Sequence, residues 1–283
     1  MIKIRFGLSK ARLIQTTWII SIFVFLAIVV TDLVAQWLGI SRHIQLLVNT
    51  RFHRDLLFAL SYTIRQAVIW LVCAIGIMAL FHKNLTQALQ EWGFNGNIKT
   101  GWLVGFVATL PMLIILGAVG HANLDANVLL DVVVFGLITG IGEEALFRGF
   151  AFGMLYRQVH LGFWLSVIIP TVFFAIGHLS EVHTLSSSIG IFLITGFGSI
   201  WFAWLYVRWE YNLWVPIAVH TFMDSWWFVF NPSNTALGNR DANIARVITI
   251  LLSIVLTLWH CHWDFRKAFI DIRPHESPLM VDA

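Results

Sequence analysis

Long apolar runs are the feature that most constrains what this chain can fold into. Segments such as 13–38, 56–81 and 102–119 approach or exceed the roughly 20 residues that a helix needs to cross the hydrocarbon core of a bilayer. A transmembrane β-strand would instead alternate apolar and polar residues over about ten positions. Because only helices and closed barrels satisfy their backbone hydrogen bonds inside a bilayer, these continuous runs predict an all-α polytopic transmembrane helix bundle.

The same character extends over the whole chain. Of its 283 residues, 58% are hydrophobic and 12% are charged, whereas a typical soluble domain is about 25% charged. No polar half is available for a separate soluble domain, so residues 1–283 are predicted to form a single membrane domain with about eight spans. The predicted spans are 13–38, 56–81, 102–119, 129–156, 163–178, 189–207, 213–230 and 244–260.

The segments between and after the spans complete the predicted topology. Residues 84–94 are too polar to span and predict a short amphipathic helix in the membrane interface, and 264–283 predict a polar, loosely ordered cytoplasmic tail. Most Lys and Arg residues fall on the side of the N-terminus, which places both termini in the cytoplasm and the chain in the cell (plasma or inner) membrane. Basic residues beside the spans also account for the net charge of +3, so no nucleic-acid partner is needed. The lipid bilayer is the expected surroundings.

Three charged residues interrupt the fourth predicted span, 129–156. Glu143, Glu144 and Arg148 lie within six positions of one another, although a charge at mid-bilayer depth costs about 2.5–3.5 kcal/mol on insertion scales. Glu144 and Arg148 have the i, i+4 spacing that favours an ion pair on a helix. Glu143 has no such partner nearby. Either the three residues form a structural salt-bridge cluster, or Glu143 is available for chemistry.

Two further polar groups lie in the fifth and seventh predicted spans. His178 follows Phe174 by four positions, and His220 precedes Asp224 by four. Taken singly, each is readily explained as a structural hydrogen-bonding residue. Together with Glu143 they could hold a divalent metal such as zinc with an open water position, through Glu143, His178 and His220. They could equally work without a metal, with Glu143 as the general base on water. Both alternatives predict hydrolysis of a carbonyl among spans four, five and seven.

The order of these groups resembles a known family. The pattern EExxxR, then FxxxH, then HxxxN or a close variant, is typical of the CPBP family of intramembrane proteases. That family includes type II CAAX prenyl endopeptidases and bacterial proteins linked to bacteriocin processing, immunity or abortive infection. The corresponding residues here are Glu143-Glu144…Arg148, Phe174…His178 and His220…Asp224, and the resemblance covers the core, about 129–230.

The resemblance implies a membrane-embedded endopeptidase, of metallo- or glutamate type, that acts on a peptide or protein substrate at the membrane. It implies catalytic roles for Glu143, His178, His220 and Asp224. Glu144, Arg148 and Phe174 would support the site or contact the substrate. Asp224 departs from the family pattern, which often has Asn there, and an acid favours an orienting or ligating role over stabilisation of an oxyanion.

Two other functions remain compatible with the same residues. One is a non-proteolytic membrane protein that binds a peptide or partner in immunity or regulation. The other is a transporter that uses the carboxylates as a proton relay. Whether a substrate would be prenylated does not follow from the residues.

Overall fold

The computed structural model describes residues 19, 22, 51–181 and 184–270, and every regular element within them is helical. The predicted first span, 13–38, therefore lies almost wholly outside the described residues. The elements are α3 (Arg51–Phe81), α4 (Leu85–Trp92), α5 (Ile98–Val119), α6 (Ala126–Asp131), η1 (Val132–Ile138), α7 (Thr139–Glu143), η2 (Glu144–Phe152), η3 (Met154–Gln158), α8 (Phe163–Gly177), η4 (His178–Glu181), α9 (Leu185–Arg208), α10 (Trp214–Phe230), α11 (Arg240–His260) and η5 (Arg266–Ile270).

The helices are long and apolar enough to confirm a polytopic bundle. In the described part of the chain, five helical stretches could cross a membrane by length and hydropathy, and α8 is a shorter apolar helix. The five are Leu56–Phe81, Ile98–Val119, Ala126–Gln158, Leu185–Arg208 and Arg240–His260. Each overlaps a predicted span with ends that differ by a few residues. The expected number of about eight spans stays a prediction.

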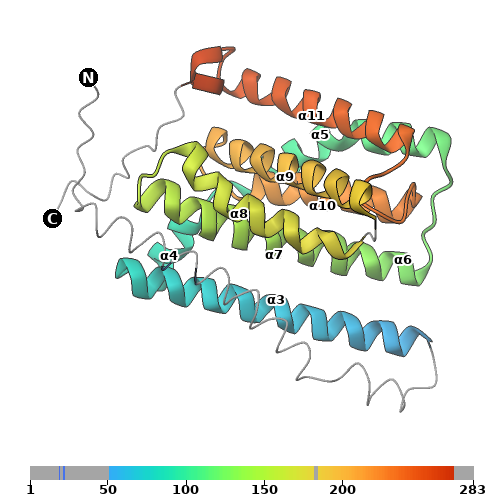
Figure 1. Ribbon diagram of the computed structural model, residues 1–283, viewed down its shortest axis with the longest axis horizontal. Coiled ribbons are helices and arrows are strands. Elements are labelled where there is room, and N and C mark those ends of the chain that lie inside the picture. The colour runs from blue at the N-terminus through green and yellow to red at the C-terminus, as the bar shows by residue number, and fades with distance from the viewer. Residues whose placement is uncertain (1–18, 20–21, 23–50, 182–183, 271–283) are drawn as a thin grey trace.

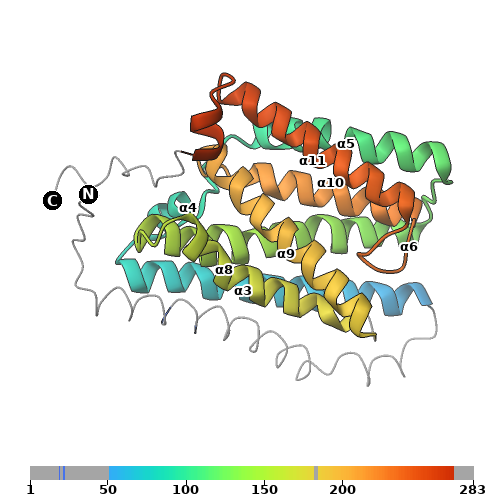
Figure 2. The ribbon, with the colours of Figure 1, turned by 45° about the horizontal axis from the view of Figure 1, so that its top comes forward.

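Helix α10 occupies the middle of the bundle. Figure 1 shows α3 along one side and α11 with α5 along the opposite side, with α7, α8, α9 and α10 between them. The same order is visible after rotation in Figure 2. Helix α10 contacts α5, η1, α7 and α9, so the segment that carries His220 and Asp224 is surrounded by other helices.

Glycines on two neighbouring helices allow α10 to approach them closely. A Cβ atom at Gly105 of α5 would lie 2.5 Å from the Cβ of Ala218, and one at Gly140 would lie 2.7 Å from Oγ1 of Thr221. Gly136, one turn before Gly140, faces Ser225 in the same way. Small residues four apart are the usual means of close helix packing in membranes. The fourth span is therefore closely packed against α10.

This packing gives a first prediction, for Gly105→Ala. The new methyl group would overlap the Ala218 side chain and lie 2.7 Å from its backbone carbon, so α5 and α10 must separate. We expect a loss of about 1–3 kcal/mol in the free energy of unfolding, measured in detergent. Gly198→Ala on α9 is the matched control, because nothing lies within 4 Å of its added Cβ. Equal stabilities of the two variants would contradict the packing described.

Two polar segments are more firmly packed than their sequences suggest. Helix α4, expected to lie in the interface, buries Trp92, whose indole Nε1 donates to the Ala145 carbonyl at 2.6 Å. The predicted loose tail begins with a folded turn, η5, where the Ala268 carbonyl accepts a hydrogen bond of 2.9 Å from Nε1 of Trp204. Residues 266–270 therefore form a turn that packs against α9 through the buried Trp204, and the cytoplasmic tail 264–283 stays a prediction. Residues 271–283 lie outside the described part.

Candidate active site

The two acids of the fourth span lie where its helix changes form. The backbone runs without a break from Ala126 to Gln158. It has wider π-type turns over Val132–Ile138, an α-helical stretch over Thr139–Glu143 and π-type turns again from Glu144 onward. Such turns often occur at functional sites. The side chain of Glu144 is completely buried, whereas that of Glu143 keeps 24% of its surface accessible. The neighbouring carboxylates therefore lie in different environments.

Glu144 is at the centre of a buried polar cluster. Its Oε1 lies 3.0 Å from the guanidinium of Arg148, which confirms the ion pair expected from the i, i+4 spacing. The same oxygen accepts a hydrogen bond of 2.7 Å from Nδ1 of His220. The Arg148 side chain is 1% exposed and lies over the rings of Phe174, at 4.6 Å, and Phe202, at 5.1 Å. Glu144 thus connects the fourth helix to α10.

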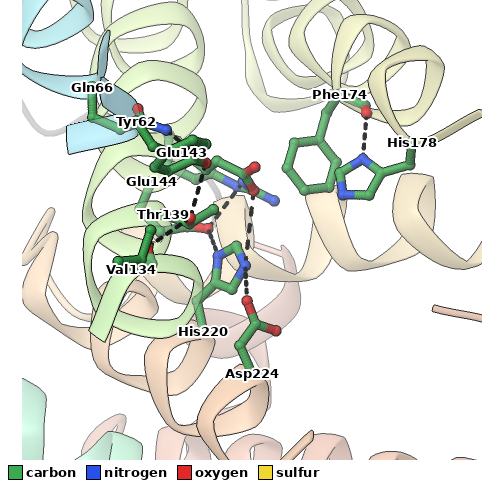
Figure 3. A network of polar contacts seen from close by, with 11 residues as sticks. Tyr62, Gln66, Val134, Thr139, Glu143, Glu144, Phe174, His178, His220 and Asp224 are labelled. Carbon is green, nitrogen blue, oxygen red and sulfur yellow. Dashed lines mark hydrogen bonds and ion pairs between the residues drawn. The ribbon is translucent and has the colours of Figure 1, made fainter. Parts of the chain in front are cut away.

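The imidazole of His220 is held in one orientation. Because the Glu144 carboxylate can only accept, Nδ1 of His220 is the donor in their bond. The other nitrogen, Nε2, lies 3.3 Å from Oδ2 of Asp224 and 3.8 Å from Oε2 of Glu143. Phe202 stacks on the ring at a centroid distance of 5.3 Å. Figure 3 shows the ring between the two glutamates on one side and Asp224 on the other.

Glu143 faces a cavity rather than a partner on its own helix. The cavity has a volume of about 430 Å³, and Glu143, His178, His220 and Asp224 all contribute to its wall. A second cavity of about 320 Å³, lined largely by apolar residues of α9 and α11, shares His178, His220 and Asp224 with the first. The four residues singled out in the sequence are therefore brought to one cavity, between α7, α8 and α10.

His178 shares this cavity but makes its polar contact elsewhere. It is the first residue of the short 3-10 turn η4 that extends α8. Its Nδ1 lies 2.8 Å from the carbonyl oxygen of Phe174, which can only accept, so Nδ1 carries a proton and Nε2 is the other available atom. Within the described residues no hydrogen bond joins it to Glu143, His220 or Asp224. Figure 3 shows it on a separate helix from them.

The metal alternative is not supported by the positions of these side chains. Among the residues that the structure describes, no three His, Cys, Asp or Glu side chains converge closely enough to hold a metal ion. In these positions Glu143, His178 and His220 do not converge on one point where a metal ion could bind. Binding of zinc to this set stays a prediction.

The structure adds polar residues that the sequence analysis missed. Tyr62 on α3 donates to or accepts from Oγ1 of Thr139 at 2.9 Å, and its hydroxyl accepts a bond of 2.9 Å from Nε2 of Gln66. Figure 3 shows this chain of contacts beside Glu143. Arg246 of α11 lines both cavities. None of these residues belongs to a motif, so sequence spacing gave no signal for them.

Comparisons with known proteins agree with the motifs. A model of the type II CAAX prenyl endopeptidase Rce1-like family matches residues 125–226, the segment with Glu143, His178, His220 and Asp224. A Bacillus subtilis (strain 168) protein described as "Putative membrane peptidase YdiL" is 26% identical over 166 residues. That alignment covers 58% of this chain and 56% of the relative, so the chain matches little more than half of the relative's length. No solved structure matches.

Proposed function

Because residues 125–226 match a model of the type II CAAX prenyl endopeptidase Rce1-like family, we propose that the protein is an intramembrane endopeptidase. One observation carries the proposal. A partly accessible carboxylate, Glu143, lines a cavity of about 430 Å³ together with His178, His220 and Asp224. Ionisable side chains among transmembrane helices are costly to bury and mark functional sites.

Glu143 is proposed as the general base. Its carboxylate takes a proton from a water molecule in the cavity while the water oxygen forms a bond to the peptide carbonyl carbon. When the tetrahedral intermediate collapses, the carbon–nitrogen bond breaks and the same proton passes to the leaving nitrogen. The products are a carboxylic acid and an amine, with no other reactant consumed. Glu143 suits this role better than Glu144, which is fully buried and already paired with Arg148.

The histidines are proposed to stabilise the negative charge of the intermediate. His220 is held by Glu144 at Nδ1 and lies beside Asp224 at Nε2, so a protonated ring has its Nε2–H directed toward the cavity that Glu143 lines. Donors fixed in advance of the reaction are worth most in a site sheltered from bulk water. Asp224 orients the ring, which agrees with the orienting role favoured for an acid at this position. His178 is proposed as a second donor in its doubly protonated form, through Nε2–H, because Nδ1–H is already bonded to the Phe174 carbonyl.

His178 allows a clean test of this role, as a second prediction. Its polar contact is with Phe174 of its own helical segment, so His178→Ala removes no hydrogen bond between helices. We expect kcat for peptide cleavage to fall about 100- to 1,000-fold, as for loss of one stabilising donor, with the thermal unfolding midpoint nearly unchanged. His262→Ala, at an exposed position outside the cavities, is the control. Unchanged kcat in His178→Ala would remove this histidine from the mechanism.

The proposed setting is the cell membrane, with both termini in the cytoplasm and a peptide or protein substrate reaching the site from the membrane. The test is cleavage by purified protein in liposomes. A pool of peptides with apolar segments is incubated with these liposomes and with empty ones, and new termini are identified by mass spectrometry. If the proposal is correct, new peptide termini form only with the liposomes that contain the protein and not with the empty ones. Peptide binding without cleavage would instead support a non-proteolytic binding protein, and proton-coupled uptake would support a transporter.

A further inference from the structure

Arg246 brings a positive charge to the candidate active site from outside the segment that matches the family. It lies near the beginning of α11, beyond residues 125–226, and lines both cavities. His178, His220 and Asp224 line the same two cavities. Because a guanidinium keeps its charge under all ordinary conditions, Arg246 acts on this site as a permanent cation.

Several contacts fix the guanidinium of Arg246 in place. Its two terminal nitrogens donate to Oδ1 of Asn243 and to the carbonyl oxygen of Ala236, each at 2.9 Å. The group also lies over the ring of Trp227, 5.0 Å from its centroid. A planar cation held by two hydrogen bonds and an aromatic face loses little further freedom when it interacts with a third group.

Among the acids around His220, Asp224 is the one whose negative charge Arg246 is placed to offset. Glu144 already has Arg148 as its ion-pair partner. Asp224 lies 3.3 Å from Nε2 of His220 with 35% of its side chain accessible, and it lines the same two cavities as Arg246. A second carboxylate, that of Glu143, approaches the same nitrogen at 3.8 Å. The negative charges of Asp224 and Glu143 beside one nitrogen repel each other, and a protonated His220 offsets only one of them.

We propose that Arg246 is a positioning residue, whose charge offsets that of Asp224 and holds the Asp224 carboxylate against His220. The inference rests on the proposed proteolytic function. Arg246 then acts through Asp224 and does not contact the substrate. Two other roles would also place an arginine here: it could simply hold the loop 231–239 through the Ala236 carbonyl, or it could bind a carboxylate of the substrate. Neither of these roles depends on the charge at position 224.

A double-mutant cycle separates the roles. The cleavage rate kcat/KM is measured on one peptide for the wild type, Asp224→Asn, Arg246→Gln and the double variant. Charge compensation predicts that Arg246→Gln costs about 10- to 100-fold when Asp224 is present, but about threefold or less when Asn replaces it. Arg246→Lys keeps the charge and loses the two fixed hydrogen bonds, so it is expected to retain most of the activity that Arg246→Gln loses.

Equal losses in both backgrounds would overturn the inference, as would an Arg246→Lys variant as slow as Arg246→Gln. If Asp224→Asn is itself too slow to measure, the thermal unfolding midpoints of the same four proteins complete the cycle. Arg246→Gln should then lower the thermal unfolding midpoint more in the protein with Asp224 than in the Asp224→Asn variant. Equal decreases in the two proteins would overturn the inference. Absence of cleavage by the wild type would refute the proposed protease function. If the wild type cleaves the peptide but the effects of the Asp224 and Arg246 substitutions are independent, only the role of Arg246 is refuted.

Discussion

Replacement of Glu143 by Gln is expected to lower kcat for peptide cleavage by about 100- to 10,000-fold, the usual contribution of a general base. The amide keeps the size of the side chain but cannot take the proton of the attacking water. Substrate affinity should change little, because Glu143 is proposed to act on water and not to hold the peptide. The measurement is the steady-state rate of the purified variant in liposomes, with kcat and KM determined separately.

The fold should survive this substitution. Glu143 makes no ion pair on its own helix, and its nearest charged neighbour, His220, is 3.8 Å away at Nε2. Glu210→Gln is the matched control, since it makes the same chemical change at an exposed position outside the cavities. We expect both variants to unfold near the wild-type temperature and only Glu143→Gln to lose activity. Full activity of Glu143→Gln at normal folding would refute its role as the base.

Glu144→Gln is expected mainly to lower the free energy of unfolding. Glu143→Gln is expected mainly to lower kcat, so the two variants distinguish the roles of the neighbouring acids. The change leaves the charge of Arg148, which is 1% exposed, without its partner at 3.0 Å. Removing one member of a buried ion pair typically costs 3–5 kcal/mol, because the remaining charge is uncompensated, and we expect a loss of about that size here. It would also weaken the bond that Nδ1 of His220 donates.

The loss can be followed through the two free cysteines. Cys73 and Cys261 are both buried, so a thiol-reactive dye reports unfolding as temperature is raised in detergent. A second variant, Glu144→Gln with Arg148→Met, removes both charges and should be less destabilised than Glu144→Gln alone. A single variant as stable as the wild type would show that the pair contributes nothing. A double variant no better than the single one would show that the uncompensated charge is not the cause.

The general architecture follows from residue patterns alone. Apolar runs of sufficient length can only be helices in a bilayer, so the bundle and most helix ends were predictable from them. The Glu144–Arg148 pair was also predictable, because both residues lie on one helix at a spacing that dictates contact. Gly136 and Gly140 are small residues four positions apart, a spacing typical of close helix approach, and the structure identifies α10 as the helix that approaches them.

The contacts between side chains of different helices were not predictable, because they depend on how each helix is rotated about its axis relative to its neighbours. The sequence suggested that His220 would serve Glu143, yet its closest carboxylate is Glu144, at 2.7 Å from Nδ1, and Glu143 is 3.8 Å from Nε2. The orientation of that ring depends on Phe202, which belongs to another helix. Arg246 lies 22 positions beyond Asp224 in the sequence, at no spacing that a helix or motif explains, and only the packing of α11 reveals it.

The most direct test of the central claim is a single turnover in water enriched in the heavy oxygen isotope. Protein in excess over peptide is allowed to cleave it once, and mass spectrometry then measures the label in the new peptide C-terminus and in the tryptic fragment that contains Glu143. If Glu143 activates water, the product carboxylate carries one heavy oxygen and the Glu143 fragment carries none. Label in Glu143 with an unlabelled product would show that the carboxylate attacks the peptide itself, and would contradict the mechanism proposed for this site.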